Sequence, residues 1–165
     1  MRIIKKVLIF LLLNYKTKLL FIEAFFLLAW ARILKAIPFS KVAPSLGEPM
    51  QETSYKRVYE NNKNLKNISN AIHIMSRYTF WESQCLVKAI AAMKMLERRN
   101  IDCTLYLGTA RDEFGKMIAH AWLRSGSFYV TGAEGMEKFT VVGKFAKRIS
   151  TNGLEGENNG YQKST

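Results

Sequence analysis

Residues 85–107, "CLVKAIAAMKMLERRNIDCTLYL", decide the fold, because the spacing of their apolar side chains changes partway along. Before Asn100 the apolar residues recur every three or four positions, which predicts a helix over residues 82–99. Beyond Asn100, a residue suited to a left-handed helix cap, apolar and polar residues alternate over 101–107, which predicts a strand. This helix and the strand after it form the centre of the predicted fold.

Further strands are predicted downstream of this unit. The apolar residues of 118–123, 128–130 and 139–145 suit strands, and "SGS" between the first two is a hairpin signal. The charged stretch "GTARDEFGKM" (108–117) predicts a loop. Because helices come first and strands follow, we expect an α+β fold, in which an N-terminal helical region precedes a helix packed on a small antiparallel sheet.

The chain has the length of one domain, and its composition divides it into three parts. Residues 1–50 are an apolar, basic helical region, which Pro38 and the turn-rich "SKVAPSLGEPM" bring to an end. Residues 51–145 form the core, with one or two short helices before residue 82. Residues 146–165 are polar, and we expect them to be a disordered tail.

The formal net charge of +12 favours an acidic partner, such as anionic lipid, nucleic acid or an acidic peptide. Charged residues at Lys16, Lys18, Glu23 and Arg32 interrupt the apolar N-terminal region, so no membrane-spanning helix is predicted. Two alternatives remain for this region. It forms either an amphipathic helix on an anionic membrane surface, or a helix hidden in its own fold or in a partner's groove.

Several classes of site are excluded by spacing. Two cysteines, Cys85 and Cys103, do not make a disulfide framework, so we expect free thiols and a reducing, cytoplasmic compartment. The sequence contains neither zinc-ligand spacing nor a glycine-rich phosphate loop, and its basic residues lack the pattern of a nucleic-acid binder. We therefore expect no metal, no cofactor and no nucleic-acid partner.

Cys85 is predicted at the N-terminal end of its helix, where free N–H groups and the helix dipole lower a thiol pKa. Ala89 and Ala92 lie on the same helical stripe and would let a sheet approach closely. A buried structural cysteine would show the same pattern. His120 in the apolar strand "MIAHAW" favours a thiol nucleophile with its base, whereas we interpret His73 as structural.

A third group should orient the imidazole. Across the "SGS" hairpin, His120 is predicted to face Thr131 or Gly132, and Glu134 would share that face. As the nearest carboxylate on that strand, Glu134 is the candidate for this role. The Thr131 hydroxyl and a backbone carbonyl are the alternatives.

A developing oxyanion would be held at the start of the same helix. The backbone N–H of Cys85 is the expected donor, because the first N–H groups of a helix lack intrahelical partners. Gln84 and Trp81 shortly precede it and are candidate helpers in oxyanion or substrate binding.

Two long segments resemble a known family. The stretches "WESQCLVKAIAAMKMLERRNIDCTLYLGTARD" and "AHAWLRSGSFYVTGAEGMEKFTVVGKF" resemble the lasso peptide biosynthesis "B-two" family of transglutaminase-like, papain-like cysteine proteases. The segment "LLFIEAFFLLAWARILKAIPFSKVAPSLG" is similar to that family's N-terminal helical region, so the resemblance covers most of residues 17–145. It implies that Cys85 is the nucleophile and His120 the general base. Gly132 stands where the family usually has an aspartate.

The resemblance also implies a substrate and partners. Such proteins remove the leader from a ribosomally made lasso precursor peptide after a separate leader-recognition protein delivers it, and an ATP-dependent lasso cyclase then closes the ring. The basic charge is compatible with an acidic leader or partner surface. The alternative is a non-catalytic peptide-binding or membrane-surface accessory module on the same scaffold, in which Cys85 and His120 are core residues.

Overall fold

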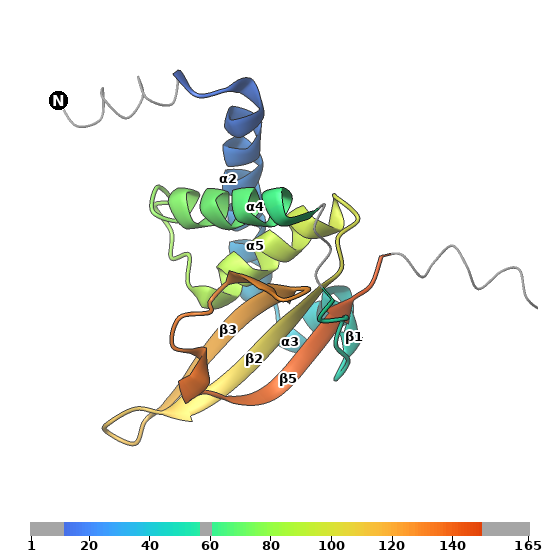
Figure 1. Ribbon diagram of the computed structural model, residues 1–165. Helices are drawn as coiled ribbons and strands as arrows, with labels where there is room; N and C mark the ends of the chain where they lie inside the picture. Colours follow the sequence, from blue (N-terminus) through green and yellow to red (C-terminus); the bar gives the residue numbers. More distant parts are fainter. Residues whose placement is uncertain (1–11, 57–60, 150–165) are drawn as a thin grey trace, which may run out of the picture.

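The computed structural model describes residues 12–56 and 61–149 and confirms the α+β fold class. Helices pack on a five-stranded antiparallel sheet (Figure 1). The helical elements are α2 (Tyr15–Lys35), α3 (Phe39–Val42), η1 (Ala43–Leu46), α4 (Asn62–Met75), α5 (Cys85–Glu97) and η3 (Met136–Lys138). The strands are β1 (Glu48–Pro49), β2 (Cys103–Arg111), β3 (Met117–Ser125), β4 (Phe128–Thr131) and β5 (Thr140–Lys147).

The strand order in the sheet is β1-β5-β2-β3-β4. Three strands, β2, β3 and β4, are neighbours in sequence and in space, as consecutive antiparallel strands usually are. The last strand, β5, returns to pair with β2 on its other side, and β1 pairs with β5. This arrangement leaves β4, the short strand next to β3, at one edge of the sheet.

The central helix and strand form where the sequence predicts them. Asn100 ends the helical region with a φ of 54°, in the left-handed conformation expected of a cap. Ala89, Ala92 and Leu96 on α5 are fully buried, so the small side chains bring the helix close to its neighbours. The predicted helical stripe behind Cys85 is therefore confirmed.

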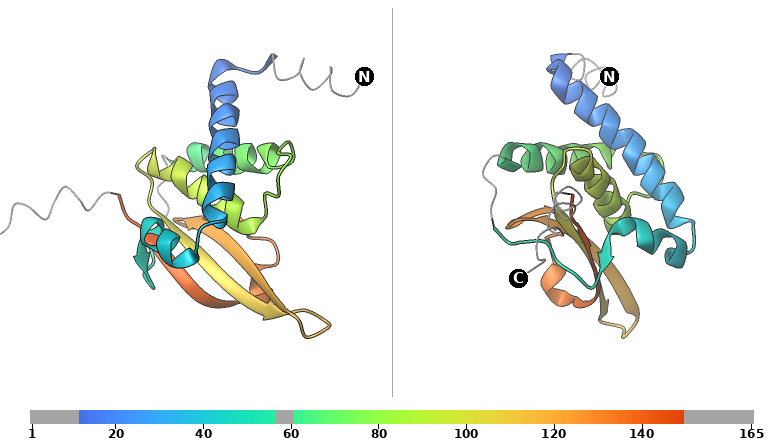
Figure 2. Two further views of the ribbon diagram at one scale, coloured as in Figure 1. Left: turned by 180° about the vertical axis from the view of Figure 1, so that it is seen from behind. Right: turned by 90° about the vertical axis from the view of Figure 1, so that its right-hand side faces the viewer.

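The N-terminal region is part of the same hydrophobic core. Ala24, Leu28 and Ala31 form the buried face of α2, which packs against α4 and α5. Figure 2 shows α2 running along the outside of the molecule, with its N-terminal end projecting beyond the other helices. One core thus joins segments on both sides of the boundary predicted at residue 50.

Two strand boundaries differ from the prediction. β2 continues to Arg111, and its Thr109 pairs with Ala119 on β3, so the predicted loop from residue 108 begins only after the strand. Ladder hydrogen bonds to both neighbours keep this polar stretch extended. β5 likewise reaches Lys147, and its Ala146 is buried, so the predicted polar tail does not begin at residue 146. The rest of that tail and residues 1–11 lie largely or wholly outside the described residues.

On the sheet face opposite the core, the segment after β1 packs over a buried arginine. Arg124 on β3 is fully buried, and its guanidinium lies 3.6 Å from the ring centroid of Tyr55. It donates hydrogen bonds to the Tyr106 hydroxyl (2.9 Å) and to the carbonyl oxygens of Thr53 (3.0 Å) and Gly126 (2.7 Å). A buried charge needs such partners. The network holds the segment after β1 across the sheet and explains why Tyr106 is buried too.

Candidate active site

A cavity of about 380 Å³ lies between α4, α5 and the segment that leaves β4. It brings together the three residues of the predicted triad, Cys85, His120 and Glu134. These residues are far apart in sequence and come from a helix, a strand and a loop. Sharing a cavity is the first geometric requirement for a nucleophile and its base.

Cys85 is the first residue of α5, which begins three residues later than the predicted start at 82, and its side chain is half-buried against the core. The preceding residue, Gln84, is extended, and its carbonyl accepts the first hydrogen bond of the helix from Lys88 (3.0 Å). No side chain of the described residues caps this helix end. The backbone N–H groups that open the helix are therefore free of intrahelical partners beside the sulfur, where an oxyanion would form.

His120 is oriented by a backbone carbonyl. Its Nε2 lies 2.9 Å from the carbonyl oxygen of Gly132, which can only accept a hydrogen bond. This contact places the ring proton on Nε2 in the neutral imidazole and leaves Nδ1 as the basic nitrogen. A base whose tautomer is fixed by one nitrogen can accept a thiol proton at the other.

Aromatic rings fix the plane of the imidazole. The ring of Trp122 is stacked with that of His120 at a centroid distance of 5.8 Å, and the ring of Phe139 lies 5.0 Å from it. Gly108, opposite His120 on β2, makes room for both, since an added Cβ would lie 2.9 Å from atoms of Trp122 and Phe139. Two rings and one hydrogen bond together restrict the imidazole to one orientation.

Gly132 can hold its carbonyl there only as a glycine. Its φ is +70°, in the left-handed region, and an added Cβ would lie 2.4 Å from the carbonyl oxygen of Ala121. At this position, where the resemblance places an aspartate, the chain lies against β3 and its backbone supplies the acceptor. The backbone carbonyl, which the sequence left as an alternative, is thus the partner that the structure shows for His120.

The register of the hairpin differs from the prediction. Thr131 pairs with Leu123, not with His120. The turn pairs Ser125 with Phe128, which by itself would set Thr131 opposite Trp122, and a bulge beside Arg124 shifts it by one further residue. β4 pairs only with residues 123–125, so the edge of β3 beside His120 is open. Alternation along β3 places His120 on the sheet face of Trp122, whereas the buried Leu123 faces the core. The imidazole therefore borders the cavity at this open edge.

Glu134 lines the cavity with an exposed side chain. Among the described residues it forms no ion pair or hydrogen bond with His120, whose Nε2 is bonded to Gly132. The role of orienter, for which Glu134 is the sequence candidate, is filled by the backbone carbonyl in this structure.

The Cys85 sulfur and the His120 imidazole do not contact each other through a hydrogen bond in the described residues, although both border the same space. Catalytic hydrogen bonds are often long or poorly aligned without substrate and tighten in the complex. A thiol and an imidazole thus border one cavity without bonding each other, an arrangement that would suit a nucleophile and its base.

Sequence reasoning missed other residues of this cavity. Lys88 follows Cys85 by one helical turn, a spacing that could have revealed it. His73 on α4 is exposed and also lines the cavity, so its interpretation as a structural residue did not foresee this position. Thr131, whose hydroxyl the sequence offered as an alternative partner for His120, also lines the cavity, and this buried hydroxyl has no hydrogen-bond partner among the described residues. No local pattern could have linked His73 to Cys85.

The two predicted helpers lie outside the residues that line this cavity. Gln84 is exposed at the N-cap position. Trp81 packs against the core, with its ring 5.2 Å from that of Phe25 and 4.6 Å from that of Phe80. Its indole N–H is buried without a partner in the described chain. A role for either side chain in oxyanion or substrate binding remains a prediction.

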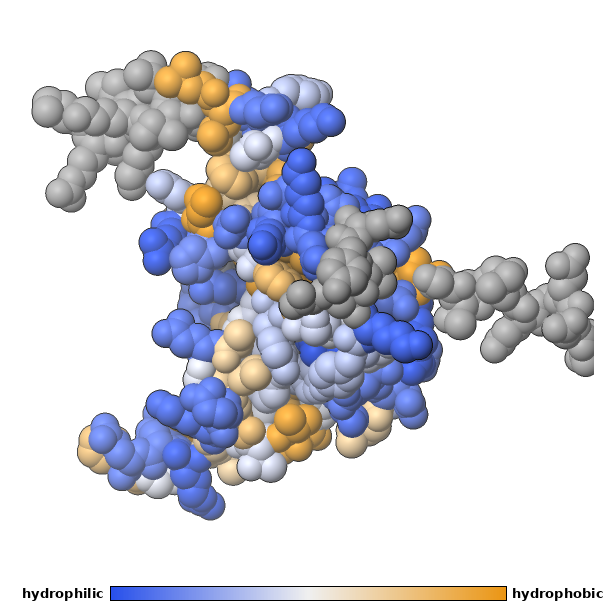
Figure 3. All heavy atoms as spheres, viewed as in Figure 1, coloured by the Kyte–Doolittle hydropathy of each residue, from blue (hydrophilic) through white to orange (hydrophobic). Residues whose placement is uncertain are grey.

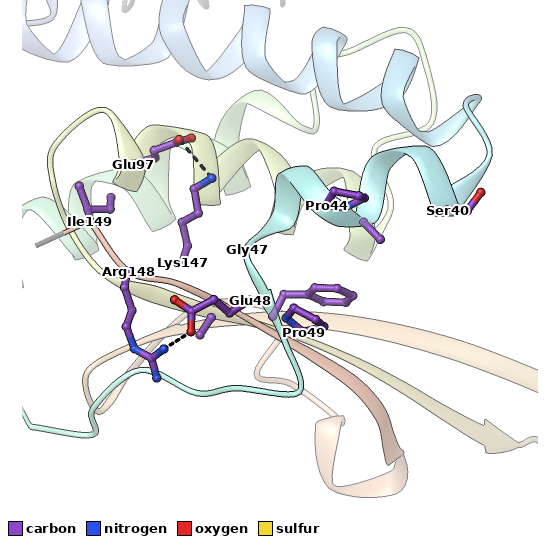
Figure 4. Close-up of a pocket in the computed structure, with 12 residues that line it drawn as sticks. Ser40, Pro44, Gly47, Glu48, Pro49, Glu97, Lys147, Arg148 and Ile149 are labelled. Atoms are coloured by element: carbon purple, nitrogen blue, oxygen red, sulfur yellow. Dashed lines mark hydrogen bonds and ion pairs between the residues drawn. The ribbon is translucent and has the colours of Figure 1, made fainter. Parts of the chain in front are cut away.

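A larger cavity, of about 780 Å³, lies at the β1 edge of the sheet (Figure 4). Its charged groups are paired with one another: Lys147 lies 3.3 Å from Glu97, and Arg148 contacts Glu48. The described residues that line it include neither a cysteine nor a histidine. Size alone therefore does not identify the reactive site, and the chemistry favours the smaller cavity.

Metal and membrane-spanning features were also sought in the described ranges. Within residues 12–56 and 61–149, no three His, Cys, Asp or Glu side chains are grouped so as to hold a metal ion. None of the helices in these ranges combines the length and the apolar character needed to span a bilayer.

Comparison with known proteins agrees with this geometry. Residues 24–144 match the transglutaminase-like superfamily, a span that starts in α2 and ends in β5. No curated protein and no solved structure matches the chain. The family match includes Cys85, His120 and Gly132, and it covers more than half of the sequence. The chain therefore belongs to the transglutaminase-like superfamily.

Proposed function

We propose that the protein is a cysteine peptidase that removes the leader from a ribosomally made lasso peptide precursor. The observation that carries the catalytic part is one cavity bordered by Cys85 at a helix start and by His120, whose ring is fixed by Gly132. Membership of the transglutaminase-like superfamily supports thiol chemistry at this site. The lasso substrate rests on the resemblance of the sequence to the "B-two" family.

The proposed reaction uses an acyl-enzyme. The Cys85 sulfur attacks the scissile carbonyl carbon while its proton passes to Nδ1 of His120. The resulting oxyanion is stabilised by the free N–H groups at the start of α5. The imidazolium then protonates the leaving amine, and the C–N bond breaks to give a thioester. Water, deprotonated by His120, attacks the thioester, and the proton returns to the thiol as the acid is released.

The size of the cavity supports a division of labour with a partner. A volume of about 380 Å³ is at the lower end of the range for small-ligand sites, so it holds only a few residues of a peptide. The rest of a leader must be held elsewhere, which agrees with delivery by a separate leader-recognition protein. An ATP-dependent lasso cyclase would consume the released core peptide.

The second candidate is a non-catalytic peptide-binding or membrane-surface module. It is favoured by the absence of a hydrogen bond between Cys85 and His120 in the described chain and by the glycine at the usual aspartate position. In this alternative the cavity would bind a peptide without cutting it.

Cleavage of a precursor peptide, followed by mass spectrometry, distinguishes the two candidates. The full chain is incubated with a lasso precursor and its leader-recognition protein, and wild type is compared with Cys85→Ala and His120→Ala. We expect leader and core fragments from wild type and from the Cys103→Ala control, and almost none from the two site variants. Cleavage at the wild-type rate by both site variants would refute the peptidase.

A further inference from the structure

The outer face of α2 carries a continuous apolar stripe. Its side chains are large, exposed and spaced by three or four residues, which places them in one row along the helix: Tyr15, Leu19, Ile22, Phe26, Trp30 and Ile33. Phe26 and Ile33 keep 66% and 65% of their surface exposed. Exposed apolar surface of this extent usually marks an interaction site.

The stripe lies opposite the face that α2 buries. Ala24, Leu28 and Ala31 face the core, about half a turn around the helix from the stripe. In the left view of Figure 2, α2 lies in front of the other helices, and no other described segment covers it. Figure 3 shows apolar atoms exposed at the projecting end of α2, beside hydrophilic side chains. The helix is thus apolar on two faces and buries only one of them.

Cations border the stripe on the side of α4 and α5. A groove of about 1000 Å³ there is lined by the exposed Lys16, Lys63 and Arg98 together with stripe residues. Its carboxylate, Glu23, is paired with Arg99 at 2.6 Å and with Arg98 at 3.4 Å. The surface beside the stripe is therefore positive, in keeping with the net charge of +12.

We propose that α2 docks this stripe on an anionic lipid bilayer, lying in the interface. A second copy of the chain would bring a second charge of +12 to the contact, which disfavours self-association. The stripe offers the apolar row and interfacial aromatic rings that a bilayer surface takes up, and the flanking cations meet anionic headgroups. No described helix can span a bilayer, so the helix lies on the surface and does not insert across it.

Vesicle co-sedimentation tests the docking with the full chain. Phosphatidylcholine vesicles with and without phosphatidylglycerol are the probes. We expect binding to the anionic vesicles, weakened by salt, and at least about a tenfold loss of affinity in Phe26→Ser/Ile33→Ser. The matched control is Phe114→Ser, which removes an even more exposed ring in the loop between β2 and β3.

A second pair of variants tests the charge. Lys16→Glu/Lys63→Glu should lose the preference for anionic over neutral vesicles while keeping the wild-type melting temperature. Cys85→Ala should bind vesicles like wild type, so the docking and the peptidase proposal fail independently.

Four outcomes would overturn the proposal. One is undiminished vesicle binding by a folded stripe variant, and another is an equal loss in the Phe114→Ser control. The third is absence of vesicle binding by the wild type with a dimer in light scattering that the stripe variant dissociates, which would assign the stripe to a second copy. Binding of wild type only to an acidic protein, with none to anionic vesicles, would likewise reject lipid as the occupant.

Discussion

The two cysteines occupy opposite kinds of environment, although they are only eighteen positions apart in the chain. Cys85 opens α5 at a cavity that also contains His120 and Lys88. Cys103 opens β2 and is fully buried, and this burial raises the pKa of its thiol far above the ordinary value. The comparison teaches that position in the fold, and not residue type, sets the environment of each thiol.

The largest expected effect is at the two cysteines, where substitution should lower the cleavage rate at one position and the stability at the other. Cys85→Ala should lower the rate of precursor cleavage by about 10³-fold or more, since the nucleophile is lost, and leave stability nearly unchanged. Cys103→Ala should keep the rate but lower the free energy of unfolding by about 1 kcal/mol through a small core cavity. Steady-state cleavage and denaturant unfolding measure the two effects. Loss of cleavage in Cys103→Ala with normal stability would break the comparison.

Alkylation probes the same contrast without a substrate. Iodoacetamide at mildly alkaline pH should modify Cys85 at least about tenfold faster than Cys103, because a buried thiol is both inaccessible and held protonated. Peptide mapping by mass spectrometry identifies the modified residue. The Cys85→Ala chain serves as the control and should stay unmodified until it is denatured. Equal labelling of both thiols in the folded chain would contradict the environments described above.

Gly132 and Gly135 offer a matched pair for the backbone around His120. Both have positive φ angles, but only at Gly132 would an added Cβ clash, at 2.4 Å from the carbonyl oxygen of Ala121, whereas one at Gly135 would meet nothing within 4 Å. Gly135→Ala should cost about 1–2 kcal/mol of unfolding free energy from its backbone angle alone, whereas Gly132→Ala should cost about 3 kcal/mol or more.

Thermal unfolding measures the stability of these two variants. Cleavage assays then test whether the Gly132 carbonyl still orients His120. Gly132→Ala should lose activity even where it is folded, as the acceptor for His120 moves. Equal costs for the two glycines would mean that the close packing against β3 is not required.

The smallest effect is expected at Glu134. Because the Gly132 carbonyl already bonds the imidazole, Glu134→Gln should cleave the precursor at the wild-type rate and with the wild-type pH dependence. Initial rates across a pH series measure this. A large drop in kcat would show that the carboxylate reaches His120 when substrate is bound.

Much of the site followed from local patterns. The helix start at Cys85, the cap at Asn100 and the strand around His120 were predictable, because periodicity and capping act over a few residues. The choice among the possible partners of His120 was not predictable. A bulge that shifts the hairpin register and the left-handed φ of Gly132, which packs against β3, decide it. Such a shift depends on pairing with a second strand, which no single stretch of sequence records.

The two faces of α2 likewise show that local sequence does not record contacts between elements. Its apolar and basic composition was plain, yet composition did not say which side would be buried. Packing against α4 and α5 buried the face with two alanines, which fits closely, and left the larger side chains outside.

By itself, the sequence determined the α+β order, the helix that presents Cys85 and the strand that carries His120, because propensity and periodicity are local properties. Only the tertiary structure decided that these two residues share a cavity and that Gly132 orients the imidazole. Those contacts join segments from separate elements, and their geometry comes from packing. At Gly132, where the resemblance led us to expect an acid, the backbone carbonyl therefore orients His120 in place of a carboxylate.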